Sequence, residues 1–156
     1  GLKREFGASV QYRLFKAGGF YWTPNTSELN FSLFGFREKD LSGLTGQVSF
    51  RGEYSAIDPK VNKGTKFSNI DGNSVTNKNF GFLSISAGLI KSWENVQLSS
   101  TIMRTGRTPG VEDLFSDGPH LGSYSYEIGN PDLDFEETFG LENSLRYKKD
   151  KFFLQN

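Results

Sequence analysis

Strict alternation of apolar and polar residues in two segments constrains the fold of this chain more than any other feature. From Glu5 to Leu14 the even positions are apolar and the odd ones are not, and the alternation from Leu44 to Ala56 has the same phase, with glycine at two of the even positions. Side chains alternate between the two faces of a β-strand, so the pattern predicts strands with one apolar and one polar face. Both segments are long enough to cross an outer membrane, for which a strand needs about 9 to 11 residues.

Weaker alternation predicts further strands in residues 80–90, 96–102 and 136–147. The residues that break the pattern are Phe80, Phe82 and Ile90 in the first segment, Ser100 in the second and Asn143 in the third. Residues 29–36 are apolar on both faces except for Asn30 and Ser32, which leaves their orientation open, and a last strand is expected to start near Lys151. We therefore predict an all-β fold, an antiparallel meander of about seven long strands that forms part of a large transmembrane β-barrel.

The connections between these strands alternate in length. The long ones are residues 16–27, 57–79 and 105–135, and the short ones are 38–42, 91–94 and 148–150. Barrels of the outer membrane have short periplasmic turns and longer extracellular loops. The first strand is thus expected to run outward, with the three long loops at the cell surface.

Composition excludes several other classes of protein. Mean hydropathy is −0.50, and no apolar run approaches the roughly 20 residues of a membrane-spanning helix. The absence of cysteine excludes disulfides and thiolate metal sites. The net charge is +0 with the charges interspersed, which argues against a nucleic-acid partner.

Residues that could carry chemistry are sparse. His120 is the single histidine, so a loop or turn role is favoured over a metal site. Four aspartates could offer oxygen ligands to calcium, but they lack the spacing of an EF-hand, and aspartate in turns usually bonds to nearby backbone. They are Asp113, Asp117, Asp132 and Asp134. No nucleophile, base and orienting group fall into a recognisable arrangement, so we expect no catalytic residue, no metal and no cofactor.

A dense series of residues between Arg107 and Glu142 carries the most specific signal. It comprises Arg107, Pro109, Glu112, Leu114, Phe115, Gly118, His120, Tyr126, Glu127, Gly129, Asn130, Pro131, Leu133, Glu136 and Glu142. This series resembles the signature region of the barrel of TonB-dependent outer-membrane receptors. One departure from the family pattern is Gly110, where the family more often has serine or threonine.

The resemblance implies a fragment of a TonB-dependent transporter in the outer membrane of a Gram-negative bacterium. Its cargo would be a scarce small-molecule ligand, such as an iron-siderophore, cobalamin or a glycan, and the protein itself would not be an enzyme. The implied partners are outer-membrane lipid, the receptor's own plug domain and the TonB system. The expected domain is a partial barrel over residues 1–156, without a plug and truncated at both ends.

Two other classes remain as alternatives. One is a non-catalytic surface or soluble β-sheet binding module, and the other, which the missing catalytic constellation disfavours, is an enzyme built on an outer-membrane barrel. Which ligand is bound stays open. The loop 57–79 could equally be a plain polar surface loop or a ligand contact.

Particular roles are expected for some signature residues. The charged side chains of Arg107, Glu112, Glu127 and Glu136 are expected to pair with one another and hold a folded-in loop, in preference to contacting substrate. Arg107 and Glu136 in particular are predicted to form a partly desolvated clamp. The dipeptide Asn130-Pro131 should start a turn. Gly129 should adopt a backbone conformation that other residues resist.

Overall fold

A computed structural model describes residues 2–16, 23–61 and 67–155 of the chain. Its main element is one antiparallel sheet in which seven strands follow the order β1-β2-β3-β4-β5-β8-β9. The strands are β1 (Leu2–Phe15), β2 (Asn25–Asp40), β3 (Leu44–Lys60), β4 (Lys78–Ser92), β5 (Val96–Arg107), β8 (Glu136–Lys149) and β9 (Phe152–Gln155). The predicted all-β meander is confirmed.

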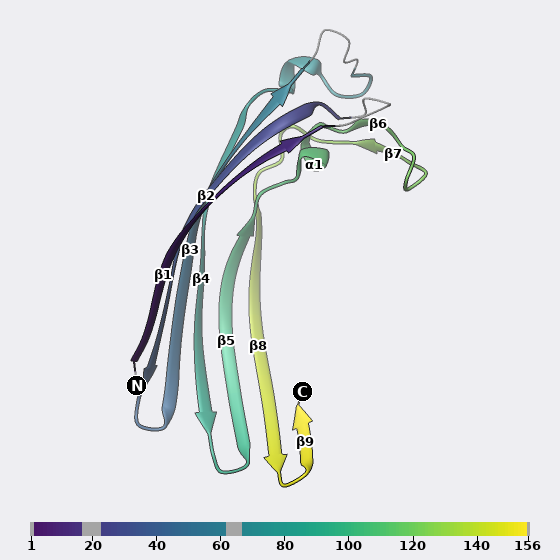
Figure 1. Cartoon of the computed structure of the whole chain (residues 1–156). Coiled ribbons are helices and arrows are strands. Elements are labelled where there is room, and N and C mark those ends of the chain that lie inside the picture. The colour runs from purple at the N-terminus through teal and green to yellow at the C-terminus, as the bar shows by residue number, and fades with distance from the viewer. Residues whose placement is uncertain (1, 17–22, 62–66, 156) are drawn as a thin grey trace.

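All the long connections leave the same end of this sheet. Figure 1 shows a tall, curved sheet with the tight turns at its lower end and the long segments at its upper end. The upper end carries the 3-10 helix η1 (Gly72–Ser74), the helix α1 (Val111–Phe115) and a hairpin of β6 (Asp117–His120) and β7 (Ser125–Ile128). Residues 17–22 and 62–66, which belong to two of the predicted long loops, lie outside the described residues.

Two strands are longer than the sequence pattern predicts. β2 includes residues 38–40, which were expected in a short turn, and β3 continues to Lys60, past the expected end at Ala56. The end of β3 is extended because residues 57–60 pair with residues 25–28 at the start of β2. The short turn that follows β2 needs only residues 41–43, where Gly43 has a φ of 84° that suits glycine.

The strand register gives the sheet one apolar and one polar face. Cross-strand partners share a face, and the partners Val10, Phe31 and Tyr54 lie on what we call the apolar face. The odd residues of β2 therefore belong to this face, which settles the orientation that the sequence left open. On the opposite, polar face the hydroxyls of Ser9 and Ser32 are 2.8 Å apart.

Most residues that break the alternation have a structural reason. Phe80 lies on the polar face and is buried, and Phe82 on the same face stacks on Phe135 at a centroid distance of 5.9 Å. Both therefore pack under the folded loop between β5 and β8. Ser100 and Asn143 are cross-strand partners on the apolar face, so these two exceptions are a single polar spot.

A small hydrophobic core lies at the loop end of the sheet. It is made of Ile57, Ile70, Val75, Phe80, Val111, Leu114 and Phe115. The three residues from α1 have 0% of their surface exposed. The core thus joins the loop before β4, the upper strand ends and the loop before β8 into one packed unit.

Candidate functional site

The first part of the signature forms the one-turn helix α1. Pro109 is buried ahead of the helix, and the Asp113 carboxylate accepts a hydrogen bond of 2.9 Å from the backbone N–H of Gly110 at the N-cap. Val111, Leu114 and Phe115 have the i, i+3, i+4 spacing that puts side chains on one helix face, here the face against the core. A serine or threonine in place of Gly110 could add a side-chain cap that glycine lacks.

Asp117 connects this loop to the loop before β4. Its carboxylate accepts hydrogen bonds from the backbone N–H groups of Ser68, Asn69 (2.8 Å) and Ile70 (3.2 Å), and from the Asn69 side-chain amide at 2.7 Å. The hydroxyl of Tyr126 donates a further bond at 3.3 Å. Burial raises the pKa of this carboxyl, but the bonds from Asn69, Ile70 and Ser68 outweigh it, so the pKa lies below its ordinary value.

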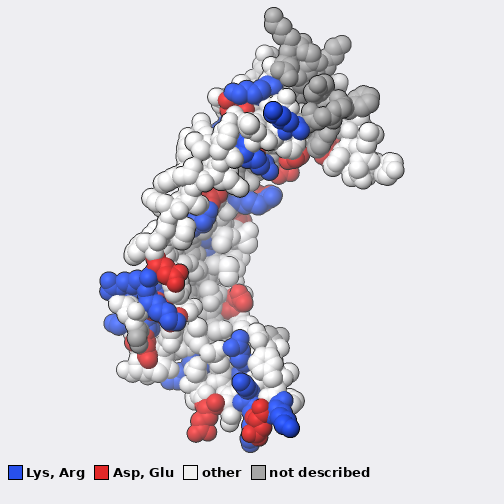
Figure 2. All heavy atoms as spheres, viewed as in Figure 1, with Lys and Arg blue, Asp and Glu red and all other residues white. Residues whose placement is uncertain are grey.

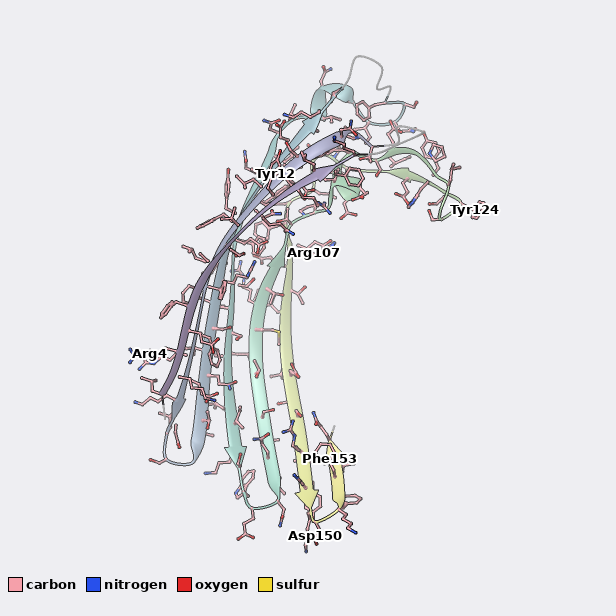
Figure 3. All side chains as sticks on the ribbon, viewed as in Figure 1. Arg4, Tyr12, Arg107, Tyr124, Asp150 and Phe153 are labelled. Carbon is pink, nitrogen blue, oxygen red and sulfur yellow. The ribbon has the colours of Figure 1, made fainter. Side chains whose placement is uncertain are left out.

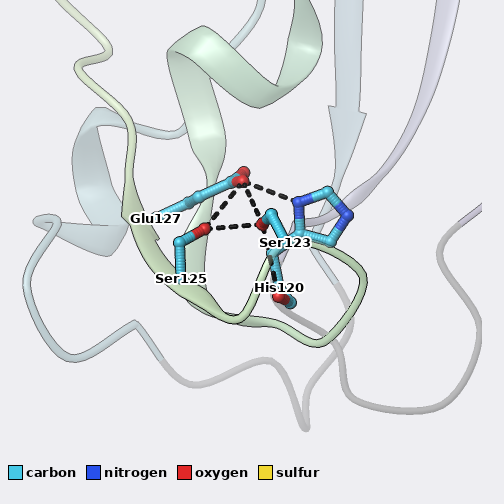
Figure 4. A network of polar contacts seen from close by, with 4 residues as sticks. All are labelled: His120, Ser123, Ser125 and Glu127. Carbon is cyan, nitrogen blue, oxygen red and sulfur yellow. Dashed lines mark hydrogen bonds and ion pairs between the residues drawn. The ribbon is translucent and has the colours of Figure 1, made fainter.

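His120 and Glu127 meet across the β6–β7 hairpin. Figure 4 shows the Nδ1 atom of His120 directed at the Glu127 carboxylate, 2.6 Å away, with the hydroxyls of Ser123 and Ser125 around the same oxygen. These contacts join the two strands and the turn of a single hairpin. The arrangement is thus a local hydrogen-bonded network that braces the hairpin tip.

Arg107 and Glu136 form the pair that the sequence predicted, but in a different environment. The Nε and Nη2 atoms of Arg107 each lie 3.0 Å from a Glu136 carboxylate oxygen, and Asp113 is 3.9 Å from the same guanidinium. The two side chains are 64% and 62% exposed. The expectation of a partly desolvated clamp is therefore wrong for the described chain, because water screens a pair this exposed. Figure 3 labels Arg107 at the upper end of β5, where β8 begins beside it.

Gly129 is required for a reason other than its backbone conformation. It is not among the glycines with positive φ, which corrects the prediction. A Cβ atom built on Gly129 would lie 2.7 Å from the carbonyl carbon of Leu114 and 2.7 Å from the backbone nitrogen of Phe115. Its own N–H donates to the Ser116 carbonyl at 2.7 Å. The chain after β7 therefore lies directly against the backbone of α1.

The remaining signature residues take different positions. Asn130 starts a turn, since its carbonyl accepts from the Leu133 N–H at 3.2 Å and its side chain from the Asp132 N–H at 2.9 Å. Glu112 lies on α1, close enough to Arg13 to interact with it electrostatically. Glu142 lies far along β8, opposite Thr101, and is not brought to the loop.

A polar hollow of 370 Å³ lies on the polar face below the signature loop. Three arginines from three strands line it, and each is paired with a carboxylate of the chain. Arg13 binds Glu28 through two bonds of 2.8 and 2.7 Å, Arg51 binds Glu53 at 2.8 Å, and Arg107 binds Glu136. The hollow thus offers many hydrogen-bonding groups with balanced charge.

Comparison with known proteins identifies the family of this sheet. Residues 1–155 match the family model described as TonB dependent receptor-like, beta-barrel. The chain belongs to this family. The family that the signature predicted is thereby confirmed, and so is the all-β class. No curated protein matches the chain.

One solved structure shows the receptor fold at low sequence identity. It is a double mutant of the Serratia marcescens hemophore receptor HasR in complex with its hemophore HasA and heme. The TM-score is 0.65 and the identity 16%, over 97% of this chain and 29% of the HasR chain. The likeness shows the fold alone, and this receptor chain spans less than a third of the length of HasR.

The described residues of this receptor barrel provide neither a cluster of metal ligands nor a membrane-spanning helix. In residues 2–16, 23–61 and 67–155, no group of three or more His, Cys, Asp or Glu side chains could hold a metal ion. Over the same residues, no helix has the length and apolar character to cross a membrane.

The residue that sequence reasoning missed is Asp117. The sequence suggests a calcium ligand or a turn cap for Asp117, as for three other aspartates, whereas its carboxylate bonds to a loop 47 to 49 residues earlier in the chain. Its hydrogen-bond partners in that loop are three backbone N–H groups and one side-chain amide. Such donors leave no pattern in a sequence, so no spacing could have indicated the contact.

Proposed function

We propose that this chain is part of the outer-membrane barrel of a TonB-dependent transporter that takes up a scarce ligand. In this proposal the apolar face contacts outer-membrane lipid, the polar face surrounds the receptor's own plug domain, and the long loops are extracellular. The observation that carries the proposal is the two-faced sheet of a receptor-family barrel, with every long connection at one end and every short turn at the other.

The polar face supports transport in place of catalysis. Its hollow holds paired arginines and carboxylates, serine hydroxyls and amides, and these groups suit contact with a polar ligand or a polar segment of protein. The cargo is an iron-siderophore, cobalamin or a glycan. Heme is a fourth candidate, because the similar HasR structure was solved with a hemophore and heme.

Uptake by the intact receptor tests the proposal. Cells that express the full protein are offered radiolabelled ferric siderophores, cobalamin, oligosaccharides and heme, with and without a functional TonB system. We expect one class of ligand to accumulate only in cells with TonB. Accumulation of every ligand at the same rate in both strains would contradict a TonB-driven transporter.

A further inference from the structure

Three basic side chains gather on the apolar face at its short-turn end. Arg4 and Arg37 are cross-strand partners, and Lys39 lies two residues along β2 opposite Leu2, which puts all three on one face. Figure 3 shows Arg4 at the outer edge of the sheet near the lower end of β1, and Figure 2 shows blue side chains at that end. We call this group the basic cluster.

No carboxylate in the part of the chain that the structure describes forms an ion pair with the basic cluster. Arg104, on the same face but at the loop end, is paired with Glu137. Arg13, Arg51 and Arg107 on the polar face are paired as well. The basic cluster thus differs from the arginines of the upper half of the sheet in having uncompensated charge.

The geometry of the basic cluster favours an anion. Like charges directly opposite each other on two strands are destabilising, and Arg4 and Arg37 are in that arrangement. A phosphate between two guanidinium groups would reverse the sign of the interaction, because guanidinium and phosphate match in charge and hydrogen-bonding shape.

An apolar hollow adjoins the basic cluster. It has a volume of 550 Å³ and is lined by Arg37 and Lys39 together with apolar side chains that include Leu41, Val48, Leu89 and Ile102. Small residues make it hollow, because Gly46 and Ala87 also line it, and a Cβ on Gly46 would meet no atom closer than 3.4 Å. The hollow therefore has positively charged side chains at one end and apolar side chains along the rest of its wall.

We propose that the basic cluster and this hollow bind one anionic glycerophospholipid from the periplasmic leaflet of the outer membrane. The phosphate lies among Arg4, Arg37 and Lys39, and an acyl chain occupies the hollow between Val48 and Ile102. The charge complementarity selects an anionic lipid, and the position near the short turns selects the periplasmic leaflet. This inference rests on the proposed function for the lipid-facing role of the apolar face.

Native mass spectrometry of the intact, detergent-purified receptor tests the lipid site. The probes are dioleoylphosphatidylglycerol and the zwitterionic dioleoylphosphatidylcholine, titrated separately. We expect about a hundredfold tighter binding of the phosphatidylglycerol, since each of the three basic residues adds about fivefold in affinity for anionic lipid. Arg4→Gln and Arg37→Gln should each lower that affinity about fivefold and lower phosphatidylcholine binding less, because the choline cation offsets the charge of its phosphate.

Two further variants separate charge from shape. Arg146→Gln removes an arginine at the same end of the sheet but on the polar face, where its cross-strand partner is Gln97, so it should change neither affinity. Gly46→Phe fills the hollow without changing charge and should weaken binding of the diacyl lipid while leaving glycerol 3-phosphate binding as it was.

Several results would overturn the inference. Equal affinity for the two lipids, or an equal loss in the Arg146→Gln variant, would mean that the basic cluster selects no lipid. Tighter binding of lipid A would assign the site to an outer-leaflet glycolipid, and glycerol 3-phosphate binding as tightly as the lipid would mean a simple anion site. TonB-dependent uptake, measured on the same Arg4→Gln and Arg37→Gln variants, reports separately on the proposed function.

Discussion

At the scale of single residues, Asp117 connects two loops of the loop end through four hydrogen bonds from residues 68–70. Its carboxylate satisfies three consecutive backbone N–H groups of another loop, and it is itself buried. A buried group that accepts several bonds is costly to alter, because each donor left without a partner loses its hydration without compensation. The two loops should therefore separate when this one carboxylate is removed.

Asp117→Ala should destabilise the loop end of the intact receptor by about 1 to 3 kcal/mol, the cost of leaving buried donors unpaired. Limited proteolysis between residues 67 and 77 measures the opening. Asp132→Ala is the matched control, since Asp132 is exposed in the same long loop. Equal rates of cleavage in the two variants would show that the Asp117 contacts do not hold the loops together.

The same carboxylate predicts a pH dependence. Because its pKa is lower in the folded protein than the unfolded value of about 3.9, its contribution to stability is complete above that value and is lost as pH falls through the folded pKa. The difference in proteolysis rate between the native receptor and Asp117→Asn should therefore be constant from pH 7 to about 5 and shrink below about 4. A difference that disappears near pH 6 would point to another titrating group.

At the scale of elements, the strands were predictable from the sequence and the loop structure was not. The faces of β1 and β3 follow directly from period-two alternation. α1 contains only five residues, too few for a helical period to emerge. β6 and β7 are strands of only four residues, and β6 contains Asp117, Gly118 and Pro119, which favour a turn. Phe80 and Phe82 break the alternation because they pack against the folded loop between β5 and β8. A pattern within one strand carries no information about a loop that folds over it from elsewhere in the chain.

The contact between α1 and the segment after β7 gives a prediction at this scale. Gly129→Ala places a methyl group 2.7 Å from backbone atoms of Leu114 and Phe115, so the two segments must move apart. We expect a loss of about 1 to 3 kcal/mol, seen as a lower melting temperature of the loop end. Gly122→Ala is the control, because its Cβ would meet only His120, at 3.5 Å. A Gly129→Ala receptor as stable as the Gly122→Ala receptor would contradict the close packing.

At the scale of the whole molecule, the account depends on which face of the sheet meets lipid. Exposed apolar side chains run from β1 to β8 on the apolar face, while charges and hydroxyls lie opposite. A soluble protein would not leave such a continuous apolar surface uncovered. In the proposed function a surrounding bilayer provides the cover, which would account for the exposure of Val10, Leu33 and Leu141 in the isolated sheet.

Neighbouring residues on β1 test the two faces. Val10→Arg places a charge on the apolar face at a cost of about 2 to 4 kcal/mol near the bilayer midplane, so it should reduce the yield of heat-modifiable receptor in outer-membrane fractions. Gln11→Arg, one residue along the same strand, puts the same side chain on the polar face and should assemble normally. Poor assembly of Gln11→Arg with normal assembly of Val10→Arg would invert the two faces.

Cell-surface labelling tests the central claim, a membrane-spanning barrel with its long loops outside, most directly. Single cysteines replace Asn73 and Tyr124 in two long loops and Glu94 in a short turn, all exposed, in a receptor whose own described residues contain no cysteine. With a membrane-impermeant maleimide on whole cells, we predict that Asn73→Cys and Tyr124→Cys react, and that Glu94→Cys reacts only after the outer membrane is permeabilised. Labelling of Glu94→Cys alone on intact cells would contradict the topology, and equal labelling at all three positions would contradict the membrane-spanning barrel itself.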